Sequence, residues 1–270
     1  MDIIYLITNY DFIWRAFVAG LAITLCASVL GVTIVLKRLS MIGDGLSHIS
    51  FGAIAVATAL GFAPLKLAIP VAALSSIILF HLGGKKMKGD SGIAVISSGS
   101  LALGIIMISY SGSGADMNNF LIGSLYSVDK NDLLVSIGLC VFVGICFILF
   151  FNRIFSVTFD EDFSNVTGSG TVIVSNLMAI LTSLTVVIGM RLMGALLISS
   201  LIVFPALSAM RVFKSFKSVS LCSLVISVIS FCFGFLLTLI LDSVPTGACI
   251  TITNLFIFLI MSFISYIKEK

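Results

Sequence analysis

The strongest constraint in this sequence is a succession of long apolar runs, separated by short segments that hold most of the charges. A helix needs about 20 apolar residues to cross the hydrocarbon core of a bilayer. Inside lipid, every backbone polar group must be hydrogen-bonded within its own helix or within a closed β-barrel. Barrel strands alternate apolar and polar residues, whereas these runs are continuously apolar. We therefore expect an all-α, polytopic membrane helix bundle.

The runs predict eight or nine crossings, because the second and third runs are short. The expected spans are residues 16–36, 46–60, 67–82, 93–110, 133–151, 172–190, 192–210, 219–241 and 248–267. Charged residues make up 10% of the chain, against about 25% in soluble domains. Since no polar segment is long enough to form a separate soluble domain, we treat residues 1–270 as a single transmembrane domain.

Basic residues predict the orientation of the bundle. With the N-terminus outside and nine crossings, eleven of the 15 lysines and arginines fall on the side that also holds the C-terminus. The positive-inside rule makes that side cytoplasmic. The basic residues stand in twos and threes at the ends of spans, so they indicate membrane topology and not a nucleic-acid-binding surface.

An acid and a histidine stand together where the second apolar run begins, in the stretch Gly-Asp-Gly-Leu-Ser-His at residues 43–48. Asp44 and His48 are four residues apart, so a helix would bring both side chains onto one face. A carboxylate and an imidazole placed in this way can share one cation. In the alternative interpretation, Asp44 caps a helix that starts near Leu46, and His48 is a satisfied interior histidine.

Two polar stretches are too long to be simple connections. Residues 111–132, on the outer side, contain a short apolar run that we expect to re-enter the membrane surface where protein shields its backbone. Residues 152–170, on the cytoplasmic side, contain three successive acids that favour the start of a short helix. Phe163 and Val166 would give this helix an apolar face. Its acids argue against a position among anionic headgroups, so we expect it to dock into a soluble partner.

Two further residues have local roles to test. Pro205 lies inside an apolar run, where it removes one backbone hydrogen bond. It would act either as a hinge during opening or as a static kink. His81 precedes two glycines at the expected end of a span, and we interpret it as a helix C-cap and not as a metal ligand.

Taken together, five stretches resemble the permease subunits of bacterial ABC importers for zinc, manganese or iron. The matching segments are residues 36–53, 116–124, 159–163, 194–206 and 245–247. They follow the order of the family and cover nearly the whole chain. Gly45 is a mild departure, since the family usually has alanine there. Near Asp162 and Ser164 the family often has glutamate and alanine.

This resemblance implies a multi-pass protein of the bacterial plasma (inner) membrane that works within a larger assembly. An extracytoplasmic metal-binding protein would deliver the ion, a homodimer of this permease would pass it through the membrane, and two copies of an ABC ATP-binding subunit would drive the cycle. The resemblance identifies Asp44 and His48 as intramembrane metal ligands. No cofactor would be bound permanently, because the divalent metal ion is the cargo. The implied coupling helix comprises Phe159, Asp160, Glu161, Asp162, Phe163 and Val166.

Several alternatives remain open from the sequence. The chain has no Gly-x-x-x-x-Gly-Lys-Ser/Thr stretch, so we expect a transport subunit that is not itself an enzyme and whose ATPase is a separate polypeptide. Zinc is the first candidate for the cargo, with manganese or iron as alternatives, because carboxylate and imidazole suit all three. An ion-coupled secondary transporter is the alternative of another class. An importer of a large metal chelate or vitamin would not need Asp44 and His48.

Overall fold

The computed structural model describes residues 11–82, 89–111, 123, 125–167, 170–241 and 244–268. Every regular element in these ranges is a helix, as the sequence predicts. The elements are α2 (Asp11–Leu36), α3 (Ile42–Ala59), α4 (Pro64–Leu82), α5 (Gly89–Ser111), the 3₁₀ helix η1 (Leu125–Ser127), α7 (Lys130–Leu149), α8 (Phe151–Phe159), α9 (Glu161–Val166), α10 (Thr171–Met193), α11 (Ala195–Val212), α12 (Phe216–Ile240) and α13 (Thr246–Lys268).

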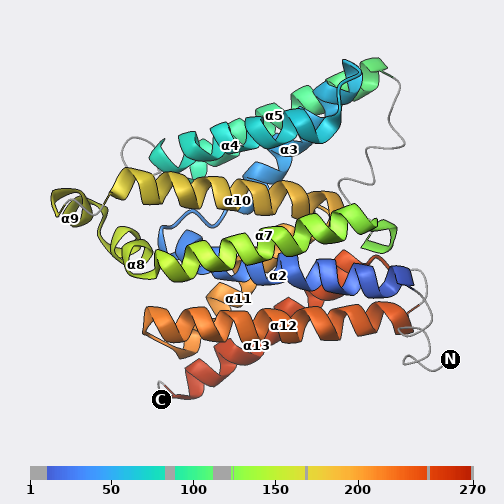
Figure 1. The fold of residues 1–270 in the computed structure, drawn as a ribbon. Helices are drawn as coiled ribbons and strands as arrows, with labels where there is room; N and C mark the ends of the chain where they lie inside the picture. Colours follow the sequence, from blue (N-terminus) through green and yellow to red (C-terminus); the bar gives the residue numbers. More distant parts are fainter. Residues whose placement is uncertain are drawn as a thin grey trace.

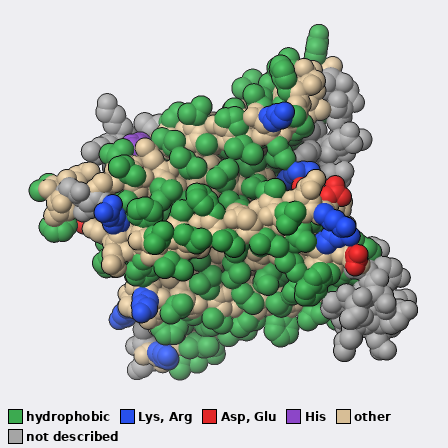
Figure 2. All heavy atoms as spheres, viewed as in Figure 1, with side chains coloured by type: hydrophobic (Ala, Val, Ile, Leu, Met, Phe, Trp, Pro, Cys, Tyr) green, Lys and Arg blue, Asp and Glu red, His purple; other side chains and the backbone are tan. Residues whose placement is uncertain are grey.

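Eight of the described helices are long and apolar enough to cross a membrane. They are α2, α4, α5, α7, α10, α11, α12 and α13. Figure 2 shows apolar side chains over the broad middle of the molecule and charged side chains toward two opposite edges, which is the pattern of a bilayer-embedded surface. The protein is therefore a multi-pass membrane protein. The 18-residue helix α3, which carries Asp44 and His48, is also part of the bundle but not one of these eight.

Helix α2 lies at the centre of one half of the bundle, where it packs against α7, α10, α11 and α12. It is the most deeply buried of the eight spans, since 78% of its most apolar 18-residue segment is buried inside the protein. In the other half, α3 packs against α4 and α5. Helices α10 and α11 contact both α2 and α3 and so join the two halves. In Figure 1, α3, α4 and α5 diverge from the remaining helices.

Glycines allow the closest helix crossings. Gly31 on α2 lies against the backbone of Ile202 on α11, so closely that a Cβ atom at this position would collide with the Ile202 carbonyl group. On α3, Gly52 lies against the backbone of Ser100 on α5 in a similar way. Small residues are typical of such crossings in membranes, because helices in lipid associate through close packing and hydrogen bonds.

Buried hydroxyl groups are mostly satisfied inside the protein. Many bond to a carbonyl one turn earlier in their own helix, as the Thr24 hydroxyl does to Gly20 at 2.8 Å. Others tie helices together: the hydroxyl of Ser76 on α4 donates to the Ala179 carbonyl on α10 at 2.8 Å. Water is absent from the hydrocarbon core and cannot bond to these hydroxyl groups. Each bond inside the protein therefore avoids the free-energy cost of burying an unpaired polar group.

The structure corrects several predicted boundaries. Helix α3 begins at Ile42, four residues before the predicted start of the second span. The chain turns between α10 and α11 at Gly194, whose φ is 89°, and not at Arg191 as predicted. Most of the polar stretch 152–170 is helical, because α8 follows α7 almost directly and buries Ile154 and Val157 on one side. Residues 112–122 and 124 of the predicted re-entrant segment lie outside the described part of the chain.

We expect Gly31→Ala to destabilise the bundle, because the added methyl group meets backbone atoms of α11 that cannot move aside. Overpacking of this kind costs about 1–3 kcal/mol. Gly138→Ala on α7 is the matched control, since a Cβ there meets nothing within 4 Å. Thermal unfolding of both variants in the same detergent measures the difference. An equal effect of the two substitutions would contradict the close α2–α11 crossing.

Candidate functional site

The candidate metal ligands lie at the start of α3. The N-cap residue of this helix, Met41, makes no side-chain capping bond, and Asp44 lies in the first turn. Asp44 therefore does not cap a helix that starts near Leu46, and that alternative is wrong. Its carboxylate is instead close to the positive end of the α3 dipole, which favours the charged form.

Asp44 and His48 come together as their spacing predicts. Asp44 Oδ2 is 3.4 Å from His48 Nε2, and 47% of the Asp44 side chain and 25% of the His48 side chain are exposed. This separation is longer than an ordinary N–H···O hydrogen bond of about 2.7–3.2 Å. The two side chains form an ion pair when His48 is protonated. Two ligand atoms at about 2.1 Å from a tetrahedral ion also lie about 3.4 Å apart, so the same spacing fits a shared cation.

One nitrogen of the His48 ring faces Asp44. Its second nitrogen, Nδ1, is buried and has no hydrogen-bond partner among the described residues, so the second bond that usually orients a metal-binding imidazole is not formed there. The described residues contain no group of three or more His, Cys, Asp or Glu side chains that could hold a metal ion. Within that part of the chain, a bound ion would have only Asp44 and His48 as such ligands. Its remaining positions would be open to water or to a second protein.

Glycines next to Asp44 bring α3 close to two other helices. A Cβ on Gly43 would lie 3.0 Å from the Ile202 side chain on α11, and one on Gly45 would collide with the Ile93 side chain on α5. The Ile93 side chain therefore occupies the space that a side chain at position 45 would need. This packing fixes the first turn of α3, and with it the Asp44 carboxylate, between α5 and α11.

The predicted coupling segment forms the short helix α9, at the tip of the connection between α8 and α10 (Figure 1). Asp160 is its N-cap and accepts a hydrogen bond from the Phe163 backbone N–H at 2.8 Å. Glu161 and Asp162 follow in the first turn. The apolar side chains of Phe159, Phe163 and Val166 are 57%, 61% and 88% exposed. This arrangement leaves an apolar surface with acids beside it at the end of the bundle.

An ion pair connects α9 to the chain just before α3. Lys37 Nζ, which follows the end of α2, lies 3.5 Å from Glu161 Oε2 and 3.4 Å from the Ser175 hydroxyl on α10. Only 14% of the Lys37 side chain is exposed. Burial lowers the pKa of Lys37, and the Glu161 carboxylate opposes this shift. Because Lys37 is separated from α3 by only four residues, the pair links the coupling segment to the helix of Asp44 and His48.

Comparison with known proteins assigns the chain to a family. The family model described as "ABC 3 transport family" matches residues 9–265. The chain belongs to the ABC 3 transport family. It is 30% identical over 271 residues to the manganese import system permease protein ScaB of Streptococcus gordonii, covering 97% of this chain and 96% of that protein. It is also 29% identical to the high-affinity zinc uptake system membrane protein ZnuB of Buchnera aphidicola, covering 93% and 97% of the two chains.

A solved structure of similar architecture supports the ABC 3 assignment. PsaBC from Streptococcus pneumoniae, in complex with Fab, matches with a TM-score of 0.83 and 27% identity, covering 96% of this chain and 93% of that chain. The resemblance and the fold class predicted from the sequence are thus confirmed. As a member of this family, the chain is a permease subunit of an ABC transporter.

The other singled-out residues of this ABC 3 protein have ordinary local environments. A ring nitrogen of His81 lies 2.9 Å from the Ile77 carbonyl oxygen, one turn earlier in α4. That carbonyl is not among the last four of the helix, so the C-cap role of His81 stays a prediction. Helix α11 continues through the buried Pro205, and the hinge role of this residue stays a prediction. Arg191 at the end of α10 pairs with Asp132 on α7 at 2.9 Å. In the sequence, Lys37 is only one of the basic residues that indicate topology, and its pairing with Glu161 comes from the structure.

We expect Glu161→Gln to destabilise this ABC 3 protein, because it leaves a largely buried ammonium group without its carboxylate. Adding Lys37→Met should recover part of that loss, with a coupling energy of about 0.5–3 kcal/mol between the two positions. Asp162→Asn is the control, since Asp162 lies in the same helical turn but is not ion-paired within the described residues. Thermal unfolding of the single and double variants tests this. Simple additivity would show that the two side chains do not interact.

Proposed function

We propose that this chain is the membrane-spanning permease of an ATP-driven importer that carries divalent metal ions into the cytoplasm. The main support is the Asp44–His48 pair, whose ligand atoms are spaced as for one shared cation. Relatives that are named as manganese and zinc transport proteins support the same class of cargo. Carboxylate and imidazole ligands suit zinc, manganese and iron, and zinc remains the first candidate.

The proposed transport step needs only moderate affinity at this pair. A charged group inside a membrane helix costs about 2.5–3.5 kcal/mol on insertion scales, and a bound divalent cation would offset part of the cost of Asp44. Two protein ligands leave coordination positions for water or for the same residues of a second copy. An ion held in this way exchanges its remaining ligands easily, as transport requires.

The proposed orientation places α9 in the cytoplasm and the start of α2 outside. The basic residues near the ends of the helices support this, because Lys37, Arg153, Arg211 and Lys268 all fall on the side of α9 when α3 is counted as a crossing. An extracytoplasmic metal-binding protein would then deliver the ion at the opposite end. Such a donor and a permease homodimer belong to the proposal.

The exposed surface of α9 is the proposed contact with a separate ATP-binding subunit, of which two copies would serve a permease dimer. Phe163 and Val166 present apolar area, while the adjacent acids would select a basic groove. Short helices commonly dock in this manner, with apolar anchors in a groove of the partner. The Glu161–Lys37 pair would then carry a movement of α9 to the start of α3.

Uptake of radioactive zinc and manganese, each competed by the other and by iron, tests the metal pair in cells that express the whole system. We expect His48→Ala and Asp44→Asn to lower uptake by about tenfold or more, because each removes one of two ligands. His81→Ala is the matched control, since it replaces the other histidine of the chain, which hydrogen-bonds to a carbonyl of its own helix. Normal uptake by the His48→Ala variant at wild-type protein level would exclude this site.

Substitutions in α9 test the coupling role. We expect Phe163→Ala to weaken binding of the ATP-binding subunit by about tenfold or more, the effect of losing an interface anchor. Metal binding should persist. Phe62→Ala is the control, because Phe62 is similarly exposed (63% against 61%) but lies at the other end of the bundle. Pull-down and ATP hydrolysis measurements provide the readout. Unchanged binding and coupling would remove α9 from the mechanism, and uptake without any ATPase would indicate a secondary transporter.

A further inference from the structure

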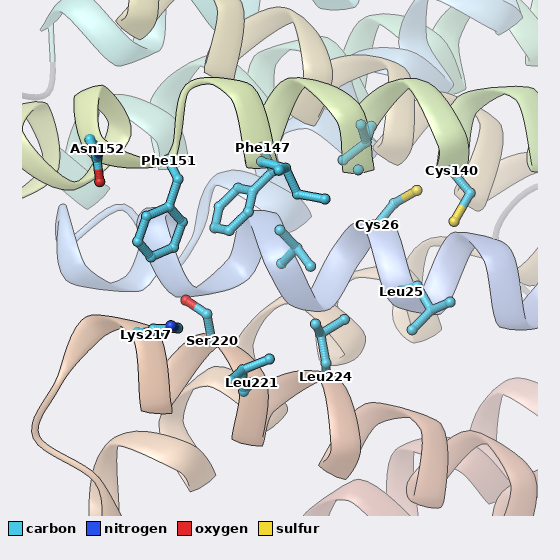
Figure 3. A pocket seen from close by; sticks show the side chains of 14 residues that line it. Leu25, Cys26, Cys140, Phe147, Phe151, Asn152, Lys217, Ser220, Leu221 and Leu224 are labelled. Atoms are coloured by element: carbon cyan, nitrogen blue, oxygen red, sulfur yellow. The ribbon is translucent and has the colours of Figure 1, made fainter.

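A large apolar cavity lies on the surface of the bundle between α7 and α12, with α2 as its floor (Figure 3). Its volume is about 890 Å³, within the range of about 300–1,000 Å³ typical of small-molecule sites. Cys26 on α2 and Val143 on α7 are buried inside the cavity, whereas Ile148 and Leu221 at its rim are 76% and 57% exposed. The cavity therefore opens on the outer surface of membrane-spanning helices, where lipid lies.

One end of this cavity is polar. Figure 3 shows Asn152 and Lys217 at the same end, projecting from opposite sides. Among the residues that line the cavity, Lys217 is the one that carries a charge. The Ser220 hydroxyl donates to the Phe216 carbonyl at 2.9 Å. Asn152 and Lys217 have no hydrogen-bond or ion-pair partner among the described residues. Their amide and ammonium groups are therefore available to a ligand.

We propose that this cavity binds an anionic glycerophospholipid. An acyl chain lies in the slot along α2, and the phosphate group binds Lys217 and the Asn152 amide. The chemistry at the two ends supports this occupant: the walls exclude water and match hydrocarbon, while the polar end matches a negatively charged headgroup. Anionic headgroups attract basic side chains near the membrane surface, and Lys217 lies in the first turn of α12. This site is separate from the proposed metal pair.

Tryptophan fluorescence with brominated lipids can detect this lipid. Trp14 is the chain's one tryptophan, so Trp14→Phe provides a silent background. Leu221→Trp then reports on the cavity, and Leu259→Trp on α13 reports on ordinary lipid contact, since the two leucines are 57% and 53% exposed. The full-length permease is reconstituted without other subunits, so that no other tryptophan contributes, in vesicles of phosphatidylcholine and phosphatidylglycerol, with bromine on one lipid at a time. At Leu221→Trp we expect about fivefold preferential quenching by phosphatidylglycerol, the effect of one lysine at a lipid surface.

Two pairs of matched variants test the assignment. Lys217→Ala should abolish the preference at Leu221→Trp, whereas Lys214→Ala, which removes an exposed lysine outside the cavity, should not. Gly144→Leu should fill the cavity and reduce quenching by both lipids, because a Cβ at Gly144 meets nothing within 4 Å. Gly138→Leu is its control on the same helix.

Two results would overturn the proposal. Equal lipid preference at Leu221→Trp and Leu259→Trp would show boundary lipid only. Absence of quenching by either lipid at Leu221→Trp, with normal quenching at Leu259→Trp, would show that a second copy of this chain fills the cavity. The experiment does not depend on metal transport, so failure of the proposed function and failure of the lipid site can be told apart.

Discussion

The absence of water from the hydrocarbon core is the constraint on which the rest of this structure depends. Each polar group there must find its partner inside the protein, and this accounts for the hydroxyl groups that bond to their own helices or to a neighbouring helix. It also explains why ion pairs lie near helix ends, as Arg191 and Asp132 do. Under the proposed function, the Asp44 carboxylate and the His48 imidazole near the start of α3 are costly polar groups in the membrane whose role is to bind the metal ion.

The contacts of α9 indicate how a movement of this helix would be passed to Asp44 and His48 on α3. Helix α9 packs on α8 and α10, and the hydroxyl groups of Ser156 and Ser164 lie 2.7 Å apart. Its direct polar connection to the segment before α3 is the Glu161–Lys37 pair. Arg38, next to Lys37, has a φ of 59°, which is uncommon for a residue with a side chain. Because only a short turn separates Lys37 from α3, a displacement of Lys37 would also displace the start of α3.

The helical bundle could be predicted from the sequence because twenty-residue apolar runs leave no alternative in lipid. The Asp44–His48 geometry was also predictable, since a four-residue spacing acts within one helix. The start of α3 was not, because Ile42 and Gly43 do not by themselves distinguish a loop from a first helical turn that α11 supports by packing. The Lys37–Glu161 pair joins residues more than 120 positions apart, and no local pattern signals such a contact.

Within the described residues, Asp44 and His48 are not part of a larger group of ligands, and this bears on the mechanism. A closed four-ligand cage is the arrangement of structural zinc sites, whereas sites that exchange their ligands keep open positions. Asp44 and His48 are both partly exposed, so an ion bound between them would keep a side open to water or to another copy. Under the proposed function, these open positions allow the ion to enter from one side and leave to the other. The packing of α3 between α5 and α11 would then control which side is accessible, because a small rotation of α3 would turn both ligands together.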